Sequence, residues 1–110
     1  MPPEDKFKFR EFFIPGYMRE GIEEYVQLGT EPGDFLGAVI SNNLKAAVLY
    51  ADDINIANLP AYVNYFYNYA PIDCWGSEAE MERWVESGGL IGIRNPKQKG
   101  LNNERRLSHY

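Results

Sequence analysis

The sequence has few of the residues on which catalytic and metal sites are usually built. Its 110 residues include one cysteine, Cys74, and one histidine, His109. A single cysteine excludes an internal disulfide and any zinc site made of cysteines alone. A cysteine nucleophile also needs a neighbouring base, and the histidine lies in the last two residues of the sequence. We therefore expect a buried structural thiol at Cys74, and a chain that is not an enzyme and holds no metal or cofactor.

Long apolar runs and phosphate-binding loops are also absent. No apolar run approaches the roughly 18 to 20 residues that cross a bilayer, and the start, MPPEDKFKFREFF, is too charged for a signal peptide. The motif G-x-x-x-x-G-K is missing. Asp52, Asp53 and Asn55 resemble the start of a calcium loop but lack its glycine and its distal glutamate, so helix capping is the better interpretation. These absences predict a cytoplasmic protein.

The bulk composition is that of one folded domain. A chain of 110 residues can bury a core without help from metal or disulfides. Its 45% hydrophobic and 25% charged residues are ordinary globular values. We expect a leader over residues 1–12, a single helical domain over residues 13–93 and a basic tail over residues 94–110.

Charge is distributed unevenly along the chain. Residues 13–93 contain three basic and twelve acidic residues, a net charge of −9, whereas residues 94–110 contain five basic residues and one acid, a net charge of +4. An acidic body repels a phosphate backbone, which disfavours direct binding of nucleic acid. The same body attracts a basic protein surface.

Apolar residues at a helical spacing predict a mainly α fold, a compact bundle of about five short helices. One helix follows Pro15 and ends at Gly29, a residue suited to a left-handed cap. The next begins near Asp34. Because its apolar stripe turns by about 100° beyond Asn42 and Asn43, we expect two short helices there, or one that is kinked.

Local signals also mark the two ends of the domain. Ser77 and Glu80 form an S-x-x-E capping box, which predicts a helix up to Ser87. The alternation in FKFREFF, within the first 13 residues, predicts a short β segment. The residues LIGI, at positions 90–93, are the other candidate for a short extended segment, and the basic tail is expected to be extended.

Five aromatic rings crowd the stretch YVNYFYNYAPIDCWGS, residues 62–77. As a strand it would align Tyr65, Tyr67 and Tyr69 on one face. As a helix it would gather most of the rings into one stripe, formed by Leu59, Tyr62, Tyr65, Phe66 and Tyr69. The prolines at positions 60 and 71, and a candidate cap at residue 58, favour the helix. This helix buries four rings in the core and leaves Tyr67, together with Trp75 in the following turn, for solvent or a partner.

Acidic side chains gather in two clusters, at residues 20–24 and 78–86. Such clusters are commonly just solvated helix faces. The functional alternative is an acidic surface that imitates nucleic acid or docks on a cationic groove. The candidate partner-binding residues are Glu20, Glu23, Glu24, Tyr67, Trp75, Glu78, Glu82, Arg105 and Arg106.

Several spaced motifs extend over residues 20–90. They are G-I-x-x-Y at 21–25, P-x-x-F-L-x-A-V-x-x-N-x-L at 32–44, A-D-x-x-N at 51–55, L-P at 59–60, Y-N-x-x-P at 67–71 and C-W-G-S at 74–77. In these motifs the chain resembles a family of small uncharacterised proteins encoded by bacteriophages and prophages of Gram-negative bacteria. The resemblance implies a phage protein that acts by binding in the cytoplasm of the host cell, and it carries over no catalytic residue.

Three functions are compatible with these features. The first is a non-enzymatic phage accessory protein that binds a bacterial protein, as an inhibitor of an antiviral defence system such as CRISPR, through acidic helix faces and exposed aromatics. The second is a protein that binds or sequesters a small ligand such as a nucleotide, with stacking walls formed by Tyr62, Tyr67, Tyr69 and Trp75. The third is a homo-oligomeric structural or assembly protein.

Overall fold

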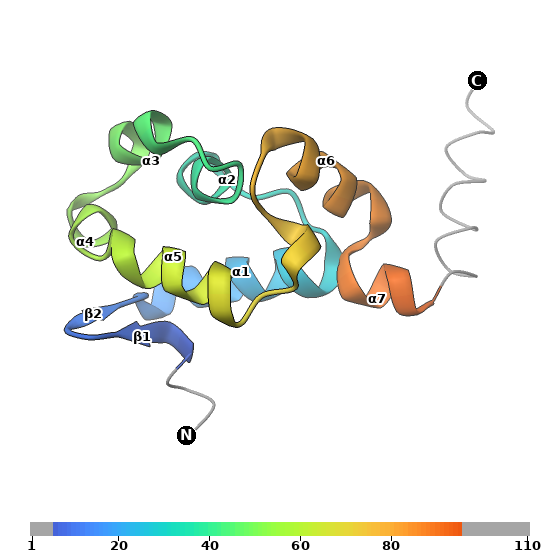
Figure 1. Cartoon of the computed structure of the whole chain (residues 1–110), viewed down its shortest axis with the longest axis horizontal. Helices are drawn as coiled ribbons and strands as arrows, with labels where there is room; N and C mark the ends of the chain where they lie inside the picture. Colours follow the sequence, from blue (N-terminus) through green and yellow to red (C-terminus); the bar gives the residue numbers. More distant parts are fainter. Residues whose placement is uncertain (1–5, 96–110) are drawn as a thin grey trace.

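Residues 6–95, the part of the chain that the computed structural model describes, form seven α-helices, the 3-10 helix η2 and a two-stranded antiparallel sheet (Figure 1). The mainly α fold predicted from the sequence is confirmed. The elements in chain order are β1 (Lys8–Phe9), β2 (Phe12–Phe13), α1 (Gly16–Leu28), α2 (Asp34–Ile40), α3 (Leu44–Tyr50), α4 (Asp53–Ala57), α5 (Leu59–Asn68), η2 (Ile72–Cys74), α6 (Glu78–Ser87) and α7 (Gly89–Arg94).

The helices are arranged along one long direction of the molecule. Figure 1 shows α2 to α5 and the hairpin gathered at one end and α6 and α7 at the other, with α1 running between the two ends. The core is built from buried apolar side chains of α1, α2, α3, α5, η2 and α6. Among the largest fully buried side chains are Tyr25, Tyr62 and Phe66. Rings from separate helices thus fill the centre of a small domain, where each buries a large apolar area.

The N-terminal segment contains the short β segment that the alternation in FKFREFF predicts. β1 and β2 form a hairpin that pairs Lys8 with Phe13 and Phe9 with Phe12. The preceding Phe7 is buried and stacks on Tyr65, with ring centroids 5.5 Å apart. Residues 6–12 therefore belong to the folded domain, because the Phe7 ring is part of its core. Residues 1–5 lie outside the described part.

The segment LIGI, at residues 90–93, is helical and not extended. It lies in α7, which follows α6 directly. Gly88 and Gly89 both have positive φ angles, 80° and 70°, a conformation that glycine adopts without the steric cost that a Cβ atom brings. These two residues turn the chain sharply enough for a second helix to start at once. The basic tail, apart from Arg94 and Asn95, lies outside the described residues.

Two capping predictions are right in part. The α5 helix carries Pro60 in its first turn, as expected. The Asn58 side chain does not cap it, because its Oδ1 accepts from the backbone N–H of Phe13 at 2.9 Å and its Nδ2 donates to the Ile54 carbonyl. The Ser77 Oγ does accept from the backbone N–H of Glu80 at 3.1 Å, while the Glu80 carboxylate pairs with Arg83.

An exposed glycine in α1 offers a stabilising substitution. Gly21 lies inside the helix, and a Cβ atom placed on it would have no neighbour within 4 Å. Glycine weakens a helix interior relative to alanine, so Gly21→Ala is expected to raise the free energy of unfolding by about 0.5–1 kcal/mol in urea titrations. Gly76→Ala is the contrasting control. Its φ of 125° strains any side chain, so it should lower stability by about 1–3 kcal/mol; a loss for Gly21→Ala would contradict the structure.

Candidate functional site

A groove of about 310 Å³ lies between α1 and the segment that leads into α2. Gly29 ends α1 in the left-handed conformation, and the turn after it brings the chain back alongside the helix. Buried Phe35 and Leu36 line the bottom of the groove, and exposed carboxylates of Glu24 and Asp34 line its edges. The full lining comprises Tyr17, Met18, Gly21, Glu24, Thr30, Glu31, Pro32, Gly33, Asp34, Phe35 and Leu36.

A second groove of about 300 Å³ adjoins the first and shares residues 31–34 with it. It lies between α2, α3 and α6, where the Met81 sulfur would come within 3.8 Å of a Cβ atom on Gly37. Glu78 and the exposed ring of Tyr50 complete its lining. We call the four exposed acids of the two grooves, Glu24, Glu31, Asp34 and Glu78, the acidic surface.

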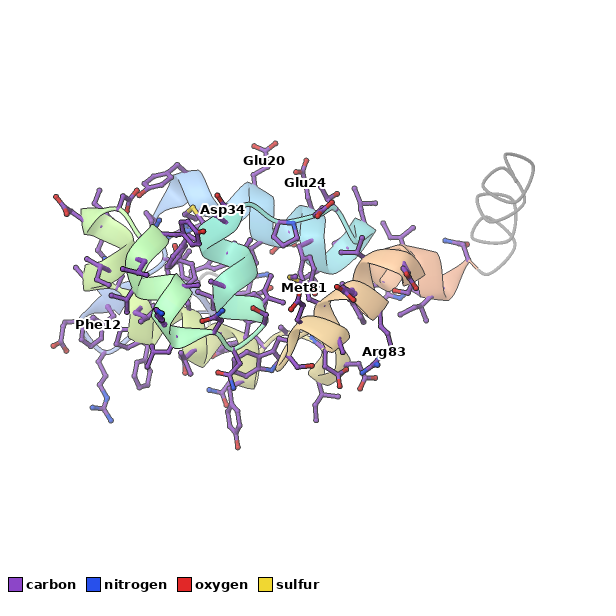
Figure 2. All side chains as sticks on the ribbon, turned by 90° about the horizontal axis from the view of Figure 1, so that it is seen from above. Phe12, Glu20, Glu24, Asp34, Met81 and Arg83 are labelled. Atoms are coloured by element: carbon purple, nitrogen blue, oxygen red, sulfur yellow. The ribbon has the colours of Figure 1, made fainter. Side chains whose placement is uncertain are left out.

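The acids of this surface have no basic partner within residues 6–95. The described chain contains two ion pairs, Lys6 with Glu23 at 3.1 Å and Arg83 with Glu80 at 2.8 Å. Figure 2 shows Glu20 and Glu24 pointing outward along one edge of the molecule, with Asp34 on the same side and Arg83 on the opposite edge. Carboxylates that share a surface without counter-charges produce a negative potential that attracts cations.

The predicted acidic residues divide among different environments. Glu24 and Glu78 belong to the acidic surface, and Glu20 lies one helical turn before Glu24 on the exposed face of α1. Glu23 is paired with Lys6, so it is not a free acid. Glu82 is exposed on α6, one turn after Glu78, and lines neither groove. Arg105 and Arg106 lie outside the described residues.

Sequence reasoning missed Glu31 and the two exposed tyrosines at the grooves, and it assigned Asp34 only to the start of a helix. Tyr17 lines the first groove and Tyr50 the second. The sequence did contain a signal for these acids, because the turn sequence T-E-P-G-D has one acid before its proline and glycine and one after them. The tyrosines lie outside the apolar stripes of their helices, as Tyr67 does in α5.

Neither Tyr67 nor Trp75 lines the two acidic grooves. A small groove of about 100 Å³ opens between α2, α3 and α5, and Trp75 closes one side of it while stacking on Phe66 at 5.7 Å. Tyr67 is 76% exposed, one turn after the lining residue Val63. We call this feature the apolar groove; it is lined by Ala38, Val39, Asn42, Asn43, Leu44, Ala47, Leu59, Val63 and Trp75.

One of the four rings assigned to the core is in fact exposed. Tyr69 is 53% exposed and only partly covered by Tyr65, whose ring lies 6.5 Å away. The reason is that α5 ends at Asn68, so Tyr69 leaves the helical stripe that the pattern continued. The other three rings, Tyr62, Tyr65 and Phe66, are buried as predicted.

Cys74 is a buried structural thiol, as predicted. It is fully buried, and burial raises the pKa of the thiol to about 12. The backbone carbonyl of Cys74 accepts a hydrogen bond from the Tyr25 hydroxyl at 2.6 Å, and the Trp84 indole donates to the Tyr25 carbonyl at 2.9 Å. This chain of bonds links η2, α1 and α6 in the core.

Asp52 caps α4, which confirms the capping interpretation of this acidic pair. Its Oδ1 accepts from the backbone N–H of Asn55 at 2.7 Å, and its Oδ2 accepts from the Tyr17 hydroxyl at 2.5 Å. The Tyr17 hydrogen bond, followed by the backbone bonds, lowers the pKa of Asp52 below its ordinary value.

Removal of the Tyr17 hydroxyl tests this arrangement. In Tyr17→Phe the pKa of Asp52, followed by NMR titration of its side-chain carbons, is expected to rise toward the ordinary value. A lowered folded-state pKa contributes stability above the unfolded-state pKa, and this contribution is lost as the pH falls through the folded-state pKa. The variant should therefore lose less stability on acidification than the wild type. An unchanged Asp52 titration would contradict the hydrogen bond.

No protein-family model, curated protein or solved structure matches this chain. Among residues 6–95, no helix is long and apolar enough to cross a membrane. Within the same residues, no group of three or more histidines, cysteines, aspartates or glutamates is placed to hold a metal ion. The acids of the acidic surface are thus spread along the two grooves and do not converge on one point.

Proposed function

We propose that the chain is a non-enzymatic binding protein that docks by its acidic surface onto a cationic surface of a bacterial protein. The observation that supports this most strongly is the set of exposed acids, without basic partners in the described chain, along two adjoining grooves. Tyr17 and Tyr50 supply exposed rings beside these acids. Tyrosine is one of the residues enriched among the side chains that contribute most to binding at protein interfaces.

The resemblance of the spaced motifs to those of phage and prophage proteins suggests the kind of partner. In this proposal the chain is a phage accessory protein of the host cytoplasm, and its partner is a component of an antiviral defence system such as CRISPR. Defence proteins that handle nucleic acid need cationic grooves for the phosphate backbone. An acidic body with a net charge of −9 over residues 13–93 would occupy such a groove and inhibit the system.

The geometry favours a protein partner over a nucleotide. Of the four proposed stacking walls, Tyr62 is fully buried and cannot contact a ligand. The apolar groove beside Trp75 measures about 100 Å³, whereas small-molecule sites usually measure about 300–1,000 Å³. The two larger grooves are edged by carboxylates, which repel the phosphates of a nucleotide.

Affinity capture with matched charge variants tests the proposal. Three tagged proteins are incubated with bacterial lysate at low and at high salt: the wild-type chain, the double variant Glu24→Lys/Asp34→Lys and the double variant Glu11→Lys/Asp73→Lys. Both double variants replace exposed acids and change the net charge by the same amount. Glu11 and Asp73, however, line neither groove. Like charges placed across an interface cost several kcal/mol, so the Glu24/Asp34 variant should retain at least about tenfold less partner.

The control variant should capture the same partner as the wild type, and that partner should be released as the salt concentration rises, because salt screens exposed charges. Equal capture by both double variants would show that binding does not depend on the acidic surface. Retention that is insensitive to salt would rule out the electrostatic mode of binding.

A further inference from the structure

Exposed apolar side chains surround the apolar groove. Leu44 and Val48 of α3 lie on one side of it, and Val63 and Tyr67 of α5 lie on the other, each pair one helical turn apart. All four are exposed, with Leu44 at 69%. We propose that this face, from here on the α3–α5 face, binds a second copy of the chain, so that two subunits cover each other's apolar groove.

The charge distribution favours a second copy as the occupant. Residues 35–72 contain only three charged residues, Lys45, Asp52 and Asp53. Lys45 does not line the groove and lies at the edge of the face, one helical turn before Val48. Two copies of a body this acidic repel each other through their other faces. The α3–α5 face brings fewer carboxylates together, because neither Asp52 nor Asp53 lines the groove and Asp52 is bonded to Tyr17 of α1.

The face offers both a depression and exposed side chains that can enter one. It combines a depression of about 100 Å³ with protruding Leu44 and Tyr67 side chains beside it. Since an apolar cavity of about 150 Å³ holds a benzene molecule, the groove is of a size to take one side chain. A two-fold interface uses the same patch on both subunits, so a side chain of each copy can enter the groove of the other.

The area that a dimer interface buries is small compared with the accessible surface of this chain. A standard interface buries about 800 Å² on each partner, roughly a tenth of the 7260 Å² surface of the chain. The centre of such an interface is apolar and poor in charge, as the α3–α5 face is. The acidic surface stays accessible in this arrangement, because Tyr50 and Ala46, which face it, lie on the opposite flank of α3 from Leu44 and Val48.

Two leucines of α3 provide a matched pair of variants. Leu44 and Leu49 are 69% and 71% exposed, but only Leu44 lines the groove. The wild type, Leu44→Glu and Leu49→Glu are compared by size-exclusion chromatography with light scattering over a range of concentrations. We expect the wild type and Leu49→Glu to reach twice the 12.6 kDa of one chain. Leu44→Glu should remain a monomer, because its carboxylate would be buried without a partner.

Val63→Glu, on the opposite wall of the groove, should give the same monomer, and circular dichroism melts show whether each variant is folded. A wild-type chain that stays at the mass of one subunit at every concentration would overturn the proposal. The α3–α5 face would then be a binding surface for a different protein. Dissociation of Leu49→Glu together with Leu44→Glu would also overturn it. Because none of these variants alters an acid of the acidic surface, the result is independent of the proposed host-protein binding.

Discussion

Gly89→Ala is expected to lower the free energy of unfolding by about 3 kcal/mol or more. Two costs add: overpacking costs about 1–3 kcal/mol, and an alanine held in the left-handed backbone conformation costs about 1–2 kcal/mol. Gly89 has a φ of 70°, and a Cβ atom there would lie 2.5 Å from the Gly29 nitrogen and 2.7 Å from the Leu28 nitrogen. All of its close neighbours are backbone atoms, so no side-chain rotation can relieve the contact. Guanidinium titrations followed by tryptophan fluorescence measure the loss.

Gly16→Ala serves as the matched control. Gly16 also stands at the first position of a helix, and a Cβ atom on it would have no neighbour within 4 Å. Its stability should stay within about 0.5 kcal/mol of the wild type, as for most surface substitutions. Similar stabilities for the Gly16 and Gly89 variants would mean that α1 and the turn between α6 and α7 do not approach as closely as described.

Phe66→Ala is expected to destabilise the chain by about 3–5 kcal/mol, the usual range for a buried phenylalanine. The Phe66 ring is fully buried, edge-to-face with Tyr65 at 5.2 Å and stacked on Trp75 at 5.7 Å. Its removal leaves a cavity between α5 and the turn that carries Trp75. The loss is measured by the same denaturant titrations.

The neighbouring residue supplies the comparison. Tyr67 is on the same helix but 76% exposed in the single chain, so Tyr67→Ala should change the free energy of unfolding of the monomer by less than about 0.5 kcal/mol. If Tyr67→Ala cost as much as Phe66→Ala, the assignment of Phe66 to the buried side and of Tyr67 to the exposed side of α5 would be wrong.

The helices were predictable because their signals are local. The apolar spacing of residues 16–28, the capping serine at position 77 and the prolines around α5 each act within one or two helical turns. The β segment in FKFREFF was also predictable from its local alternation, but the burial of Phe7 and the start of α7 depend on distant contacts. Phe7 is held by Tyr65, and the start of α7 packs against the end of α1. Neither partner can be deduced from the local pattern.

The candidate site was predictable only as separate pieces. The acids on α1 and α6 and the exposure of Tyr67 follow from helical periodicity. The adjoining grooves bring together Glu24, Asp34 and Glu78, which lie on three different helices. Their proximity therefore depends on how these helices pack in the fold. For the same reason the sequence could not show that Trp75 lines a groove separate from those of these acids.

Carbodiimide crosslinking tests docking by the acidic surface most directly, because the reagent joins a carboxylate to a lysine only where the two are in contact. The chain is crosslinked to the partner retained in the capture experiment, and the joined peptides are identified by mass spectrometry. We predict links from Glu24, Glu31, Asp34 or Glu78 to lysines of the partner, lost as salt is raised. Links confined to Glu11 and Asp73, outside the grooves, would contradict the proposed function.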